Sequence, residues 1–178
     1  MTRHLTRKDY AEMAWANGRG TTIEMLRETA EDGGILWRFS MAIVAEDGAF
    51  SLFPDIERNL TVIDGPGFDL LGNTNFRADL LCPVAFPGDM ALAAHNVTGP
   101  AVDFNVMTRR HLPKPKVEVV SGGVIAPVSG AVLCIFALGK AQFGDYILTH
   151  HDLLVAAPAA VLTGAPCIAV HLFTATGD

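Results

Sequence analysis

The sequence has few cysteines, and this scarcity limits its chemistry. It contains three, Cys82, Cys134 and Cys167, with no CxxC pair among them. A disulfide framework and a thiol-based zinc site are therefore both unsupported. Each cysteine stands in an apolar context, so we expect core thiols in a reducing compartment. The segment Met1–Tyr10 is charged and lacks the apolar stretch of a secretion signal, which favours a cytoplasmic location.

Histidine patterns typical of metal sites are also missing. The six histidines are His4, His95, His111, His150, His151 and His171, and no two of them form an HxH pair. The neighbours His150 and His151 would point to opposite faces of a strand, so they could not both bind one ion. We therefore expect no metal and no cofactor.

Several other signatures are absent. There is no G-x-S-x-G elbow, no phosphate-cradling loop and no plausible cysteine nucleophile with a histidine near it. The net charge of −6 argues against a nucleic-acid partner, because duplex binding needs clustered positive charge. The longest apolar run, residues 153–170, is interrupted by Pro158, Gly164 and Pro166, so core strands explain it better than a membrane span.

The sequence is instead rich in short strand signals. Half of its 178 residues are apolar, which is enough to bury a substantial core. Runs rich in β-branched and aromatic residues, bounded by Gly, Pro, Asp or Asn, predict an all-β sandwich or barrel; they span 35–44, 59–65, 116–124, 131–138 and 167–173. The segment 21–32 fits either a helical turn or a strand.

Alternation within the segment 36–44 separates two faces. Trp37, Phe39, Met41 and Ile43 share one face, which we expect to lie in the core. The other face is mixed, because Arg38 and Ser40 lie on it among Leu36, Ala42 and Val44.

A proline-rich segment at 112–116 forms the natural internal boundary. Pro113 and Pro115 favour an extended conformation that cannot pair as a central strand. We expect a first half over about 12–110 and a second over about 117–175, packed as one compact unit over 1–178 because either half alone would expose sheet edges. Open edges also favour a homodimer.

Three stretches together resemble the HutD/Ves family. They are WANGRGTTIE at Trp15–Glu24, WRFSMAIVAEDGAFSLFPDIERNLTVIDG at Trp37–Gly65 and AFPGDMALAAHNVTGPAVDFNVMTRR at Ala85–Arg110. The resemblance covers nearly the whole chain. It implies an RmlC-like cupin fold with two barrel-like halves, an association with bacterial histidine utilisation, and a regulatory or ligand-binding role with no assigned reaction.

Polar residues embedded in the apolar strands are the candidate site. Each has a structural interpretation as a turn, cap or surface group. Asp103 and Asn105, however, straddle Phe104 and so face the same side of a strand, and in a barrel one face of each strand looks into the cavity. The candidate ligand-binding residues are Trp15, Asn17, Glu24, Ser40, Arg58, His95, Asp103 and Asn105.

Arg58 stands two residues before the predicted strand that starts at Leu60, and it shares parity with Leu60 and Val62. It is either a solvated arginine or an anion-binding group on the cavity wall. A desolvated guanidinium needs a partner, so Glu24 or Asp103 could hold it until an anion binds. Its planar fork suits a carboxylate.

Together with Arg58, the resemblance to the HutD/Ves family implies a non-catalytic cupin that binds a small carboxylate of histidine catabolism, of the urocanate or formylglutamate class, and regulates or buffers that pathway. Two alternatives stay open. One is a metal-independent enzyme that uses Glu24 or His95 as general acid or base. The other is a stress-related interaction protein with an exposed apolar patch and no small ligand.

Overall fold

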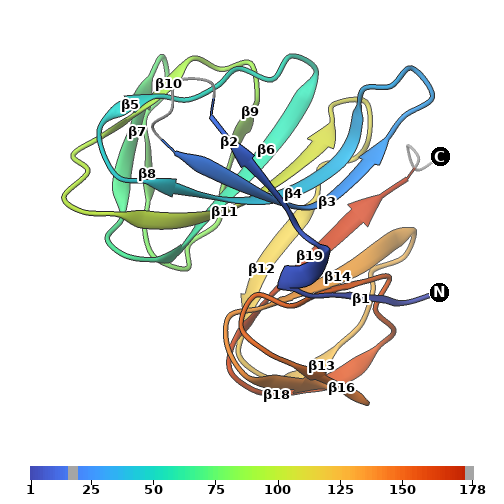
Figure 1. The fold of residues 1–178 in the computed structure, drawn as a ribbon. Coiled ribbons are helices and arrows are strands. Elements are labelled where there is room, and N and C mark those ends of the chain that lie inside the picture. The colour runs from blue at the N-terminus through green and yellow to red at the C-terminus, as the bar shows by residue number, and fades with distance from the viewer. Residues whose placement is uncertain (16–19, 175–178) are drawn as a thin grey trace. The chain divides into compact units, whose positions relative to one another are not determined.

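The computed structural model describes residues 1–15 and 20–174, and the chain is all-β (Figure 1). The described residues contain one short 3-10 helix, η1 (Arg7–Asp9), and no α-helix. No helix among them is long and apolar enough to cross a membrane. The chain divides into two compact units: the first unit is Ala11–His111, and the second unit is Met1–Tyr10 together with Leu112–Asp178. The N-terminal segment thus joins the second unit, which a division at 112–116 alone does not foresee.

The first unit contains two antiparallel sheets. Its strands are β2 (Ala11–Ala14), β3 (Thr21–Thr29), β4 (Ile35–Val44), β5 (Gly48–Ala49), β6 (Ile56–Asp64), β7 (Phe68–Gly72), β8 (Phe76–Ala78), β9 (Val84–Pro87), β10 (Leu92–His95) and β11 (Ala101–Arg109). One sheet has six strands in the order β2-β3-β4-β11-β6-β9, and the other has the order β5-β10-β7-β8.

The core of the first unit lies between these two sheets. Leu60 and Val62 of β6 enter it from the six-stranded sheet, while Phe68 and Leu70 of β7 enter it from the four-stranded sheet. All four side chains are fully buried. Alternate residues of each strand therefore define an inner face, which positions the site described below.

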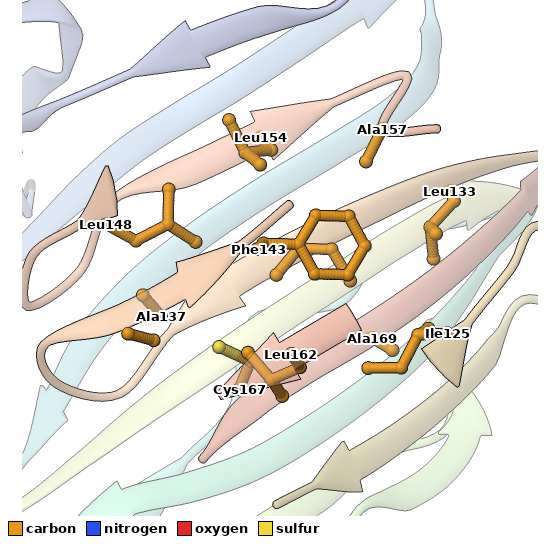
Figure 2. Packing of buried hydrophobic residues seen from close by; sticks show 12 residues of the cluster. Ile125, Leu133, Ala137, Phe143, Leu148, Leu154, Ala157, Leu162, Cys167 and Ala169 are labelled. Carbon is orange, nitrogen blue, oxygen red and sulfur yellow. The ribbon is translucent and has the colours of Figure 1, made fainter. Parts of the chain in front are cut away.

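The second unit repeats this two-sheet arrangement. Its strands are β1 (Arg3–Leu5), β12 (Lys116–Val120), β13 (Gly123–Ile125), β14 (Ala131–Ala137), β15 (Ala141–Phe143), β16 (Tyr146–Leu148), β17 (Leu153–Val155), β18 (Ala160–Gly164) and β19 (Cys167–Phe173). They form sheets of order β1-β17-β14-β19-β12 and β13-β18-β15-β16. Figure 2 shows Phe143 in the middle of the core cluster, with Leu133 and Leu162 among the residues around it.

The strands settle one ambiguity, confirm part of the expected core and contradict other parts. The ambiguous segment 21–32 contains the strand β3, and Trp37, Phe39 and Met41 are buried. Ile43, predicted for the same core face, is 51% exposed, although the next residue of β4, Val44, is buried in the core on the opposite face. Cys134 and Cys167 are buried, but Cys82 is exposed, since it lies in the turn between β8 and β9 rather than in a strand.

Candidate functional site

A cavity of about 1010 Å³ opens within the first unit. Its walls come from the inner face of β3, β4, β6 and β11, from the segment 45–53 and from Ala94 of β10. Trp15, beside β2, also contributes to the lining. The uncharged polar and charged lining residues contributed by β3, β4, β6 and β11 are Thr22, Arg38, Ser40, Arg58, Asp103 and Asn105.

Strand register explains why these side chains gather. Met107 of β11 pairs with Arg38 of β4 on one side and with Arg58 of β6 on the other. Two residues earlier in β11, Asn105 pairs with Ser40 and Leu60. Because side chains alternate between faces, these rows project from the same face of the sheet. Polar and apolar side chains are therefore interleaved on the inner face.

Arg58 is buried in aromatic surroundings, with only 7% of its surface exposed. Its guanidinium carbon lies 5.3, 5.4 and 5.2 Å from the ring centroids of Phe50, Phe53 and Phe86. Nη2 donates to Asn105 Oδ1 at 2.8 Å, and Nη1 makes a longer contact of 3.4 Å with the Ser51 carbonyl. The buried Nε has no hydrogen-bond partner among residues 1–15 and 20–174.

The surroundings of Arg58 disfavour its charge without removing it. Burial lowers the pKa of Arg58 most, the charge of Asp103 raises it and the nearby Arg38 lowers it, and together these effects leave its pKa at about 10. Arg58 thus stays cationic at neutral pH. No carboxylate in the described part of the chain lies within ion-pair distance of it. A buried cation compensated mainly by a neutral amide and three rings is poised to accept an anion.

Asp103 lies deeper on the same face and is buried, with 2% of its surface exposed. Its Oδ1 accepts a hydrogen bond of 2.7 Å from Asn105 Nδ2. Burial raises the pKa of Asp103 to about 6, even though Arg58, the Asn105 side chain and the Ala42 backbone favour its ionised form. Asn105 therefore links a carboxyl on one side to a guanidinium on the other.

Arg38 is the second arginine of the cavity, and it has its own carboxylate. Its Nε donates to Glu24 Oε2 at 2.6 Å, and its Nη1 lies 3.8 Å from Met107 Sδ. Arg38 is 8% exposed in this pair and Glu24 is 15% exposed. Glu24 is thus committed to Arg38 and does not hold Arg58, for which it was one of two expected partners.

The predicted site residues are only partly brought together. Trp15, Ser40, Arg58, Asp103 and Asn105 line the cavity. Two others lie off its lining: Glu24 reaches it only through Arg38, and His95 is an exposed residue of β10 whose Nδ1 lies 3.8 Å from Asp47 Oδ2. Asn17 falls outside the described residues.

The strand that carries Arg58 starts earlier than predicted. β6 begins at Ile56, not at Leu60, so Arg58 is a strand residue paired with Met107 and Phe86. The polar residues 57–59 were left outside the predicted strand, but pairing with β9 on one side and β11 on the other holds them extended. Tertiary pairing here overrides local composition.

The cavity is also lined by four residues that were not predicted as site residues: Arg38, Phe50, Phe53 and Met107. The mixed face of 36–44 already contained Arg38, and this was the signal that could have added it. The two phenylalanines come from the segment between β5 and β6, which alternation does not place. Among the described residues, no group of three or more His, Cys, Asp or Glu side chains could hold a metal ion.

Comparisons with known proteins agree on one family. The family model for HutD matches residues 7–169. Protein Ves of Citrobacter koseri is 35% identical over 147 residues, which cover 76% of this chain and 72% of Ves. HutD from Pseudomonas fluorescens SBW25, solved in a formate condition, is 29% identical with a TM-score of 0.85, covering 97% of this chain and 98% of that one.

A third match has the same architecture. A conserved protein of unknown function from Pseudomonas aeruginosa PAO1 is 26% identical, with a TM-score of 0.84 over 98% of this chain and all of that chain. With the all-β sheets described above, these likenesses confirm the expected cupin fold.

Proposed function

The chain belongs to the HutD family, and from that premise we propose that it is a non-catalytic cupin whose first-unit cavity binds a small carboxylate metabolite of histidine catabolism. Urocanate and formylglutamate are the leading candidates. By sequestering such an intermediate, the protein would regulate or buffer histidine utilisation in the cell.

One observation supports this proposal above the others: Arg58 is a buried cation that lines the cavity without a carboxylate partner. Its Nε is unpaired, and its Nη2 is held by a neutral amide. Burying an unpaired guanidinium costs free energy, and pairing it with an incoming anion would recover part of that cost. A carboxylate can accept two parallel hydrogen bonds from the fork, and the surrounding rings would shield that pair from water.

Calorimetric titration of the purified protein with urocanate, formylglutamate and formate tests the proposal. Formate is the smallest carboxylate, and the solved HutD from P. fluorescens is described in a formate condition. We expect at least one of these acids to bind, and Trp15 fluorescence to respond, since its indole lines the cavity and donates to Thr22 Oγ1 at 2.8 Å. No heat for any acid up to millimolar concentration would contradict the proposal.

Arg58→Lys is the decisive variant, because it keeps the charge and removes the fork. We expect affinity to fall by about 1.5–3 kcal/mol, or roughly ten- to a hundredfold. Arg77→Lys is the matched control, since Arg77 is a half-exposed surface arginine paired with Asp69 and Asp79. It should bind like the parent protein. Unchanged affinity with a lowered melting temperature in Arg58→Lys would make Arg58 a structural residue.

A metal-independent enzyme is the second candidate function, and Asp103 is the observation that favours it. A cavity carboxyl with a pKa of about 6 is suited to proton transfer at neutral pH. Asp103 is a better candidate for this role than Glu24 or His95, because it lines the cavity and they do not. Following each acid by NMR during long incubation with the protein would reveal turnover; new signals that vanish in Asp103→Asn would favour catalysis.

A further inference from the structure

We propose that the cavity takes up its carboxylate together with one proton, and that Asp103 is the residue that receives this proton. The inference rests on the proposed function, because it concerns the same ligand at Arg58. It makes Asp103 a specificity-determining residue that competes with the ligand when ionised and accommodates it when neutral.

The geometry places Asp103 and Arg58 in contact only through a third residue. Asn105 accepts from Arg58 Nη2 at 2.8 Å through its Oδ1 and donates from Nδ2 to Asp103 Oδ1 at 2.7 Å. All three residues line the cavity and all three are at least nine-tenths buried. Asp103 and Arg58 are therefore a separated pair, and the Nε of Arg58 has no hydrogen-bond partner among the described residues.

The other charged groups near the cavity have little effect on the electrostatic interaction between Asp103 and Arg58. On β3 and β4, Glu24 and Arg38 neutralise each other at 2.6 Å. The carboxylates of Glu46 and Asp47, in the exposed segment before β5, lie where water screens them, and His95 of β10 faces Asp47. The charge of Asp103 is thus opposed chiefly by Arg58 of β6.

The ligand and Asp103 compete for Arg58, and this competition couples ligand binding to proton uptake. In the empty site, Arg58 is the largest influence that favours the ionised form of Asp103, and burial opposes it. A carboxylate that pairs with Arg58 cancels that influence and adds a second negative charge nearby. The ionised form of Asp103 then loses its support, so its pKa rises and it binds a proton from solvent. The ligand keeps all its bonds, and the cavity gains one anion and one proton.

The expected signature is affinity that falls as pH rises. Below about pH 6 Asp103 already carries the proton in the empty site, so binding should not depend on pH. Above that value each ligand must bring a proton, so affinity should fall towards about tenfold per pH unit. Formate suits this test, because it stays fully ionised over that whole range.

Calorimetry with formate from about pH 5 to pH 8 measures the slope, and repeating it in two buffers of different ionisation enthalpy counts the protons taken up. We expect close to one proton per formate near pH 7.5. Asp103→Asn should bind at pH 8 about as tightly as the parent protein binds at pH 5.5, with no proton uptake. Asp79→Asn, a change at an exposed carboxylate away from the cavity, should keep the slope.

The outcomes separate this inference from the proposed function. Formate binding with no pH dependence and no proton uptake would overturn the inference and leave carboxylate binding intact. A slope that persists in Asp103→Asn would overturn it as well, by moving the proton to another group. Absence of binding at every pH would overturn both. Should Asp103→Asn fail to fold, the two-buffer measurement on the parent protein still decides.

Discussion

At the scale of single residues, the buried carboxyl of Asp103 should make stability depend on pH. Below its ordinary pKa of 3.8, Asp103 is protonated in both folded and unfolded chains. Between 3.8 and about 6 only the folded protein keeps the proton, so stability falls as pH rises. Above about pH 6 the penalty is complete, on the order of 3 kcal/mol.

Asp103→Asn therefore should stabilise the protein at pH 7.5 and have little effect near pH 4. Asparagine keeps an oxygen for the Asn105 bond and removes the buried charge. Urea denaturation at both pH values measures the difference. Asp89→Asn is the opposite control, because the hydrogen bond from Arg110 lowers the pKa of Asp89, so losing that carboxylate should destabilise at pH 7.5. Equal stability of Asp103→Asn and the parent at pH 7.5 would contradict the burial effect.

Residue chemistry was the part of the site that the sequence revealed best. Period-two alternation placed Asp103 with Asn105 and Arg38 with Ser40, because side-chain direction in a strand depends only on local geometry. It could not show that Glu24 would pair with Arg38 rather than with Arg58. That choice depends on the register between β3 and β4, where Glu24 lies opposite Ser40. Register is a tertiary property and leaves little trace in a single sequence.

At the scale of elements, two glycines in turns of the first unit form a matched pair. Gly33, between β3 and β4, and Gly65, between β6 and β7, both have φ of +81°. A Cβ at Gly33 would meet nothing within 4 Å, whereas a Cβ at Gly65 would lie 2.2 Å from the Pro100 carbonyl oxygen. The two positions share backbone strain and differ in crowding.

Gly33→Ala should cost about 1–2 kcal/mol, the penalty of the left-handed conformation for a residue with a Cβ. Gly65→Ala should cost clearly more, because backbone must also move where β6 turns into β7. Chemical denaturation of the two variants gives the comparison. Equal losses would mean that the turn at Gly65 relaxes freely and that the close approach of Pro100 does not constrain it.

Element boundaries were the least predictable part of the fold. The strands were visible because their apolar alternation is local, but their ends were set by partners. β6 extends back to Ile56 because β9 and β11 pair with its polar residues. Cys82 was expected in the core from its apolar neighbours, yet it lies in a turn, where hydrophobic composition says nothing about burial.

At the scale of the whole molecule, the cavity and the amino terminus belong to different units. All lining residues of the cavity lie within Ala11–His111. The N-terminal strand β1 instead pairs with β17 of the second unit, where Arg3 lies opposite Val155. The expected first half began at about residue 12 and left the N-terminal segment unassigned to either half, so this pairing was not foreseen.

Asp152 connects the N-terminal segment to the rest of the second unit through its contact with His4. This buried residue accepts from the Thr149 amide at 2.9 Å and hydroxyl at 3.1 Å, and its Oδ2 lies 3.0 Å from His4 Nε2. Asp152→Ala leaves the Thr149 amide without this acceptor, so we expect a loss of about 1.5–3 kcal/mol of stability. Carboxylate affinity should not change at temperatures where circular dichroism shows the variant folded, because no cavity residue is altered. Weakened binding by a fully folded Asp152→Ala protein would show that the site depends on the second unit and is not contained in Ala11–His111.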